Sequence, residues 1–147
     1  VGQLVDVEDL DEATAALGNE RLAARTRHVV SEIARTRAFI ELLDEGPLEG
    51  TRLAVAGALL NDSHDSLRDD YEVSCEELDV AVEAARAAGA HGARMTGGGF
   101  GGSAIALVDA HAVEDVARAV AAAYAERGWE PPHFIRSLPG APAGRLD

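Results

Sequence analysis

The chain has 147 residues, 47% of them hydrophobic and 27% charged, which is the balance of an ordinary soluble globular protein. Its formal net charge of −13, with thirteen scattered arginines and no lysine, argues against a nucleic-acid partner. The single cysteine, Cys75, excludes an intrachain disulfide, and no stretch resembles a signal peptide or a membrane span. We therefore expect residues 1–147 to form one cytoplasmic domain that does not contact a membrane.

The first half of the chain predicts three helices. Residues 7–17 are acidic and helix-prone, with Asp9 or Asp11 available to cap the first turn. A long helix over 20–43, ended by Gly46 and Pro47, follows from an apolar stripe of Leu22, Val29, Ile33, Ile40 and Leu43. A second long helix over 51–70 has its own stripe, made of Leu53, Ala56, Leu60, Ser63, Leu67 and Tyr71. The short connection predicts that the two long helices pack as an antiparallel pair.

The start of a further helix, over 75–88, is marked by local signals. Ser74 and Glu77 have the spacing of a capping box, and Val73 and Leu78 that of a hydrophobic staple. Cys75 then falls in the first turn, where the helix dipole can lower a thiol pKa, although packing is the role that we favour. His64, beside the stripe of the preceding helix, is interpreted as a hydrogen-bonded core histidine rather than a catalyst.

The second half alternates short strands with one helix. We expect strands over 91–96, 103–108 and 133–138, the second of them buried, and a helix over 112–127. The tail 139–147, rich in proline, glycine and alanine, is expected to fray. This order predicts an α+β fold of ferredoxin-like type, with an antiparallel sheet and helices packed on one face.

The loop between the first two strands is the main candidate site. Five of the six residues 97–102 are glycine. A strand follows the loop, whereas a dinucleotide fingerprint requires a helix there, and no Gly-Lys-Ser/Thr closes the loop as in a Walker A motif. Successive amides in a glycine-rich turn can still bind an anion such as phosphate. The alternative is a tight turn that needs positive φ, and we expect Gly99→Val to separate the two by reducing activity more than stability.

Three segments of the chain together resemble one enzyme family. Residues 95–102 (MTGGGFGG) resemble the third signature motif of the GHMP small-molecule kinases. Residues 63–79 (SHDSLRDDYEVSCEELD) are similar to the galactokinase branch of that family, and residues 27–32 (RHVVSE) agree with it. The resemblance covers about residues 20–108 and is weak at both ends.

This resemblance implies transfer of the γ-phosphoryl group of ATP to the anomeric hydroxyl of galactose, with Mg²⁺, in a site shared by two halves of an enzyme. The catalytic residues belong to an N-terminal half, so we expect none in this sequence, which looks like the C-terminal domain alone. We expect it to be inactive by itself and to bind no cofactor tightly. Phosphate-side or sugar-side contacts are expected from the glycine loop: Thr96, Gly97, Gly98, Gly99, Phe100, Gly101, Gly102 and Ser103.

Other charged residues near these motifs are weaker candidates. Arg94 and Arg68 are possible anion neighbours, but a surface or structural role is favoured for both. Asp69 and Asp70 adjoin at a helix end without a third convergent ligand, which argues against a metal site. Two other functions stay open: a sibling GHMP sugar kinase, because the residues that read the sugar lie upstream, and a galactokinase-like sensor that binds ligand without turnover.

Overall fold

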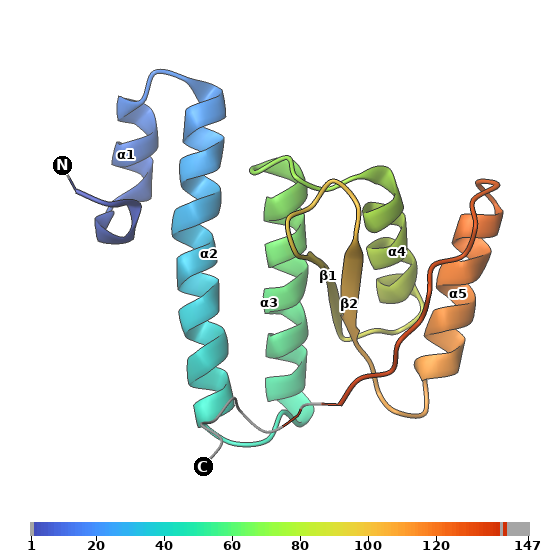
Figure 1. Cartoon of the computed structure of the whole chain (residues 1–147). Helices are drawn as coiled ribbons and strands as arrows, with labels where there is room; N and C mark the ends of the chain where they lie inside the picture. The colour runs from blue at the N-terminus through green and yellow to red at the C-terminus, as the bar shows by residue number, and fades with distance from the viewer. Residues whose placement is uncertain (1, 139, 141–147) are drawn as a thin grey trace, which may run out of the picture.

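The computed structural model describes residues 2–138 and 140 of the chain. It is an α+β fold in which one two-stranded sheet lies among helices (Figure 1). A short 3₁₀ turn at Leu4–Asp6 precedes the regular elements. These are α1 (Leu10–Ala16), α2 (Glu20–Asp44), α3 (Gly50–Asp69), α4 (Glu76–Ala87), β1 (Gly92–Thr96), β2 (Ser103–Leu107) and α5 (Val113–Ala125).

The helices confirm the predictions made from periodicity and from stop signals. Asp9 caps α1 by accepting a hydrogen bond from the amide of Glu12, and Asn19 caps α2 in the same way. Helices α2 and α3 stand side by side as the expected antiparallel pair (Figure 1). None of the helices described in residues 2–138 is both long and apolar enough to cross a membrane.

The predicted start of α4 was wrong in its detail. The N-cap is Cys75, which makes no side-chain capping bond, so the expected capping box of Ser74 and Glu77 does not form. Instead the Ser74 hydroxyl donates to a carboxylate oxygen of Asp79 at 2.5 Å. The capping box fails because the helix begins one residue later than its spacing requires, which leaves Ser74 outside the N-cap position.

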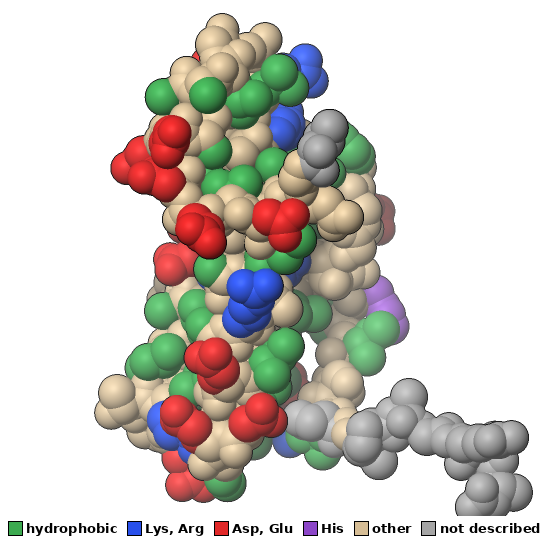
Figure 2. Space-filling model, turned by 90° about the vertical axis from the view of Figure 1, so that its left-hand side faces the viewer, with side chains coloured by type: hydrophobic (Ala, Val, Ile, Leu, Met, Phe, Trp, Pro, Cys, Tyr) green, Lys and Arg blue, Asp and Glu red, His purple; other side chains and the backbone are tan. Residues whose placement is uncertain are grey.

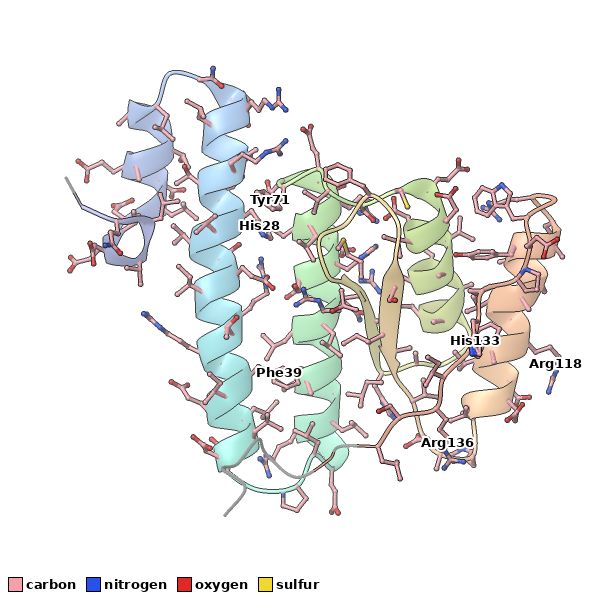
Figure 3. The ribbon with its side chains drawn as sticks, viewed as in Figure 1. His28, Phe39, Tyr71, Arg118, His133 and Arg136 are labelled. Carbon is pink, nitrogen blue, oxygen red and sulfur yellow. The ribbon has the colours of Figure 1, made fainter. Side chains whose placement is uncertain are left out.

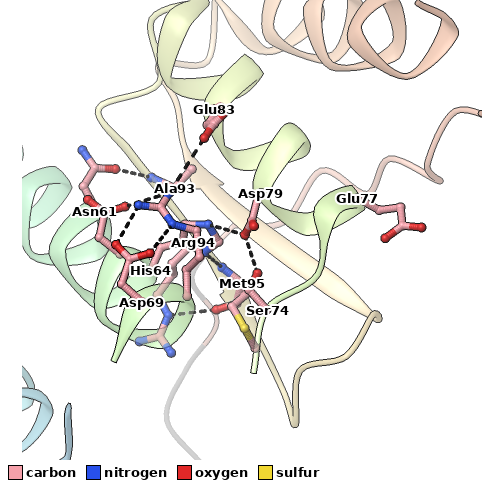
Figure 4. Close-up of polar contacts among 12 residues, drawn as sticks. Asn61, His64, Asp69, Ser74, Glu77, Asp79, Glu83, Ala93, Arg94 and Met95 are labelled. Atoms are coloured by element: carbon pink, nitrogen blue, oxygen red, sulfur yellow. Dashed lines mark hydrogen bonds and ion pairs between the residues drawn. The ribbon is translucent and has the colours of Figure 1, made fainter. Parts of the chain in front are cut away.

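The sheet is a hairpin whose first strand is enclosed by α3 and α4. Its antiparallel register pairs Gly92 with Leu107 and Thr96 with Ser103. On the outer edge of β1, the amide of Ala93 donates to Asn61 Oδ1 at 3.0 Å, and the amide of Met95 donates to His64 Nδ1 at 3.2 Å (Figure 4). Side chains of α3 therefore satisfy the donors that a third strand would otherwise pair.

Two glycines allow α3 to lie directly against the start of β1. A Cβ atom on Gly57 would stand 2.0 Å from the carbonyl oxygen of His91, and one on Gly92 would stand 2.2 Å from the carbonyl oxygen of Gly57. No side chain fits in this contact, so both positions need glycine for close packing. The contact fixes the height of β1 along α3, and with it the position of the loop that follows β1.

Two apolar clusters hold the sheet and helices together. The larger one joins α4 and α5 to β1 and contains Val80, Val82, Ala85, Ala93, Val116, Val120 and Tyr124. The smaller one joins α3 and α4 beneath the far end of β1 and contains Leu67, Leu78 and Met95, with Val73 and Cys75 packed against it. Met95, which is fully buried, is the last core residue before the glycine loop.

Two sequence predictions about burial and strands were wrong, and a third is not tested. Strand β2 is exposed rather than buried, with Ile105 49% accessible, because β1 and α4 cover one edge and one face of it and leave the rest open. Residues 133–138 form no strand, and Ile135 in that segment is 81% accessible. Of the tail predicted to fray, all but Gly140 lies outside the described residues.

The apolar stripe predicted for α2 is also only partly buried. Leu22, Ile40 and Leu43 are about half accessible, whereas the buried positions of this helix are Ala23, Thr26, His28 and Leu42. Figure 2 shows the face that carries α1 and α2, where apolar side chains alternate with acidic ones at the surface. A stripe identifies the apolar side of a helix but does not show which part of that side a neighbouring element covers.

Candidate functional site: the glycine loop

The eight predicted site residues lie together at one end of the hairpin. Thr96 and Ser103 are paired as the last residue of β1 and the first of β2, and the six-residue loop 97–102 closes between them beside the α3–α4 connection (Figure 1). Four loop glycines have positive φ: Gly97 (88°), Gly99 (83°), Gly101 (123°) and Gly102 (95°). Phe100 also has a positive φ, of 59°, which is uncommon for an aromatic residue.

One side of the loop is anchored to the α3–α4 connection. The amide of Phe100 donates to the carbonyl oxygen of Val73 at 2.7 Å. A Cβ atom on Gly99 would stand 2.1 Å from the same oxygen. Gly99 is therefore glycine because of the fold, and the expectation that Gly99→Val would reduce activity more than stability is revised: the substitution should unfold the loop as well.

The other side of the loop is open. A Cβ atom on Gly97, Gly98, Gly101 or Gly102 would meet nothing within 4 Å, and the Phe100 side chain is 77% accessible. Within the described residues, the amide of Phe100 is the one amide of the loop with a hydrogen-bond partner. The remaining loop amides have no hydrogen-bond partner among the described residues, and successive amides of a glycine-rich turn are able to bind an anion without a charged side chain.

A partly buried ion-pair network supports the strand that leads into this loop. Arg94 donates to Glu32 at 3.0 Å and to the carbonyl oxygen of Met95 at 2.9 Å. Glu32 also accepts hydrogen bonds from Ser63 at 2.6 Å and from Arg35 at 2.8 Å. Burial opposes ionisation of Glu32, but these hydrogen bonds and the charges of Arg35 and Arg94 hold its pKa below the ordinary value. The network joins α2, α3 and β1.

The other charged candidates are likewise paired within the chain. The guanidinium group of Arg68 donates to both carboxylate oxygens of Asp69, at 2.8 and 2.9 Å, and this pairing raises the pKa of Arg68. Asp70 accepts from Arg27 and from Ser66, each at 3.1 Å. Among the described residues, no group of three or more His, Cys, Asp or Glu side chains could hold a metal ion.

His64 and Cys75 have structural surroundings. His64 is fully buried, and its Nε2 atom lies 3.2 Å from Asp79 Oδ1 without meeting the geometry of a hydrogen bond (Figure 4). Burial, helped by the charge of Arg86, lowers the pKa of His64, so the imidazole is neutral and its Nδ1 accepts from Met95. Burial raises the pKa of the Cys75 thiol, contrary to the lowering that a helix dipole would cause.

Sequence reasoning missed a second cluster, at the end of α3 nearest the loop. His28 and Tyr71 stack with ring centroids 4.5 Å apart, and the two side chains meet between α2 and α3 (Figure 3). His28 Nδ1 lies 3.1 Å from the hydroxyl of Ser66. Burial lowers the pKa of His28. No periodicity indicated this cluster, because its members come from two helices and a turn that the sequence separates by more than thirty residues.

Comparison with known families shows which family the chain belongs to. Residues 39–126 match the family model "GHMP kinases C terminal", which is more than half of the chain, so the chain belongs to the GHMP kinase family through its C-terminal domain. Strands β1 and β2 and the glycine loop lie inside the matched range, whereas the first half of α2 lies before it.

The relatives are galactokinases. The chain is 47% identical over 143 residues to a galactokinase of Streptomyces coelicolor, covering 97% of this chain and 36% of the relative, and 42% identical to one of Mycobacterium tuberculosis, covering 88% and 35%. It is similar to a crystal structure of Lactococcus lactis galactokinase complexed with galactose, with a TM-score of 0.79, 42% identity and coverage of 88% and 33%. The chain thus spans about a third of the length of these relatives.

Proposed function

We propose that this chain is the C-terminal part of a galactokinase, which transfers the γ-phosphoryl group of ATP to the C1 hydroxyl of galactose in the cytoplasm. The observation that carries the proposal is the similarity of nearly the whole chain to galactokinases at 42–47% identity. A mevalonate kinase of L. major in complex with R-mevalonate is less similar, at a TM-score of 0.56 and 25% identity. This difference favours the galactokinase branch over a sibling GHMP kinase.

In this proposal residues 1–147 form one domain, and the loop 96–103 is one wall of a site completed by an N-terminal domain. The open amides of Gly97, Gly98, Gly101 and Gly102 would approach the phosphate or the sugar, with the hydroxyls of Thr96 and Ser103 beside them. Phosphoryl transfer depends on positioning and on stabilising the charge of the transferred group. The chain supplies positioning by backbone donors and no catalytic side chain.

ATP and Mg²⁺ need different groups, and this chain offers groups for the phosphates of ATP in its loop. The loop amides suit a phosphate group, because they are donors that need an acceptor. Mg²⁺, which neutralises charge on the phosphates, is usually held by one or two carboxylates together with the phosphates themselves. The adjoining carboxylates of Asp69 and Asp70 are already paired with Arg68 and with Arg27 and Ser66. We therefore assign the metal site to the N-terminal domain and expect this chain alone to bind Mg·ATP weakly.

Galactose-dependent release of ADP, measured on this chain and on the same chain extended by its upstream sequence, tests the proposal. We expect turnover by the extended protein alone. Turnover with another sugar and none with galactose would replace the proposal with the sibling kinase. Binding of galactose or ATP without turnover by the extended protein would replace it with a non-catalytic sensor.

A further inference from the structure

The α3–α4 connection, residues 70–75, is the structure to which the glycine loop is anchored. Its Val73 accepts the hydrogen bond from Phe100 and lies against Gly99. The connection is itself held in an uncommon conformation, because Glu72 has a φ of 56°. Such a conformation persists only where the surroundings determine it. Val73 itself is tied to α3, because its amide donates to the carbonyl oxygen of Leu67 at 3.1 Å. It follows directly on residues 70–72, so what holds those residues also affects its position.

The backbone amides of Asp70 and Tyr71 donate to the carbonyl oxygen of Ser66 in α3, and helix α2 supplies the side chains that hold residues 70–72 from its own side. Arg25 donates to the carbonyl oxygen of Asp70 and to the carboxylate of Glu72, and its guanidinium carbon lies 5.7 Å from the centre of the Tyr71 ring. Tyr71 in turn stacks on His28, at 4.5 Å between ring centres and 10° between planes. Three consecutive residues of the connection are thus in contact with two side chains of α2.

The base of the connection is fixed by a second set of bonds. The Ser66 hydroxyl lies 3.1 Å from His28 Nδ1 and donates to the Asp70 carboxylate at 3.1 Å. Arg27 donates to the other oxygen of that carboxylate, also at 3.1 Å. These bonds prevent residue 70 from moving away from α2, so the contact between α2 and the connection is specific rather than a single flexible salt bridge.

We propose that Arg25 and Tyr71 are positioning residues for the glycine loop, acting through Val73. The contacts run from α2 to residues 70–72, from there to Val73, and from Val73 to Gly99 and Phe100. Both residues act through the backbone of the connection and touch no residue of the loop in the contacts that the structure describes. Arg25 also lies before residues 39–126, so the family match does not assign it a role.

Amide hydrogen exchange in this chain reads out the last contact directly. The amide of Phe100 reports its bond to Val73, while the amides of Ala93 and Met95 report the edge of β1, which does not pass through the connection. In Arg25→Ala and in Tyr71→Ala, we expect exchange at Phe100 to accelerate about tenfold, with less than about a threefold change at Ala93 and Met95. The control Arg37→Ala, at an exposed position on the same helix, should change none of the three.

A conservative variant separates positioning from general loss of stability. Tyr71→Phe keeps the ring that stacks on His28 and should leave the exchange of Phe100 unchanged. Acceleration of all three amides by one factor in Arg25→Ala would overturn the proposal, because it would show global destabilisation. An unchanged rate at Phe100 in both alanine variants would overturn it as well.

A kinetic measurement extends the test to function and rests on the proposed function above. In the extended protein, Arg25→Ala should lower kcat about tenfold and change the KM for galactose by less than about twofold, since misplaced loop amides would weaken contacts made in the transition state. Faster exchange at Phe100 with unchanged kcat would support the positioning role and refute the proposed role of the loop in catalysis. A lower kcat with unchanged exchange would refute the positioning role.

Discussion

Two groups of glycines lie within ten residues of each other along β1 and the loop, and they differ in what surrounds them. Gly92, with its partner Gly57 on α3, is in a contact so close that any Cβ atom would overlap backbone atoms. Gly97, Gly98, Gly101 and Gly102 face open space. The same residue type is thus required by close packing in one region, whereas in the other no packed neighbour requires it.

Gly98 shows most clearly that the fold does not require glycine at an open position of the loop. The other three open glycines have positive φ, which alone disfavours a side chain, but Gly98 has neither a positive φ nor a neighbour. The fold therefore tolerates a methyl group at this position. Glycine also serves where something must approach the backbone closely, and this is the basis for our proposal that the loop is a binding wall.

The largest effect should come from the packing glycines. Gly92→Ala is expected to destabilise the chain by about 3 kcal/mol or more, because the new methyl group overlaps the backbone of α3 and the two elements must separate. Urea unfolding measures the change, with Gly98→Ala as the matched control in the same segment. A loss below about 1 kcal/mol would show that α3 can shift away from β1 without cost.

The network beneath β1 should give the next largest effect. Glu32→Ala leaves Arg94 and Arg35 without their partner in a partly buried place, so we expect a loss of about 2–3 kcal/mol. Because the pKa of Glu32 is below its usual value of 4.5, its contribution is complete above about pH 4.5 and is lost as the pH falls through the lower pKa of the folded state. Glu32→Gln should therefore show a flatter fall in stability below pH 4.5 than the parent, and an equally steep fall would contradict this assignment.

Gly99 lies in the loop but is packed against Val73, so it tests whether a loop glycine can also be required by packing. Gly99→Ala is expected to cost about 1–3 kcal/mol, because the methyl group meets the carbonyl of Val73, although the exposed loop can yield more than the packed helix can. The same unfolding experiment measures it. A change as small as that of Gly98→Ala would mean that the loop is not anchored to Val73.

A smaller effect concerns the buried histidine under β1. The pKa of His64 is lowered by burial from its usual value of 6.5, so the unfolded chain binds a proton first and stability decreases as the pH falls below 6.5. We expect this decrease in stability over the range from pH 6.5 to 5.5. His64→Asn keeps an acceptor for the Met95 amide but does not titrate, so its stability should fall less over that range. If the stability of His64→Asn fell as steeply with pH as that of the parent, the group that binds the proton on unfolding would not be His64.

Much of the fold could be predicted from the sequence where the signals are local. Stop residues and apolar spacing located α2, α3, α4 and α5 to within about two residues, and the glycine run located the turn of the hairpin. Burial could not be predicted in the same way. Ile105 lies in an apolar strand and Leu43 on an apolar stripe, yet both are about half exposed, because burial depends on which other elements cover a face.

The position of the candidate site could be predicted from the sequence, but the residues that hold the loop in place could not. The loop residues are contiguous, so the sequence alone brings Thr96 and Ser103 together. Val73 contacts the loop directly, and Arg25 and Tyr71 are linked to it only through the three-dimensional contact between α2 and the α3–α4 connection. The prediction of a strand over 133–138 was wrong for a related reason. Two prolines precede this segment, and no strand in the described residues pairs with it.

Gly98→Ala, introduced into the extended protein, tests the central claim most directly. Its thermal stability and its rate of galactose-dependent ADP release would be measured together with those of the parent. We predict a free energy of unfolding within about 0.5 kcal/mol of the parent and a rate at least about tenfold lower, because the methyl group would occupy space reserved for the ligand. An unchanged rate would contradict the claim that this loop is a wall of the active site.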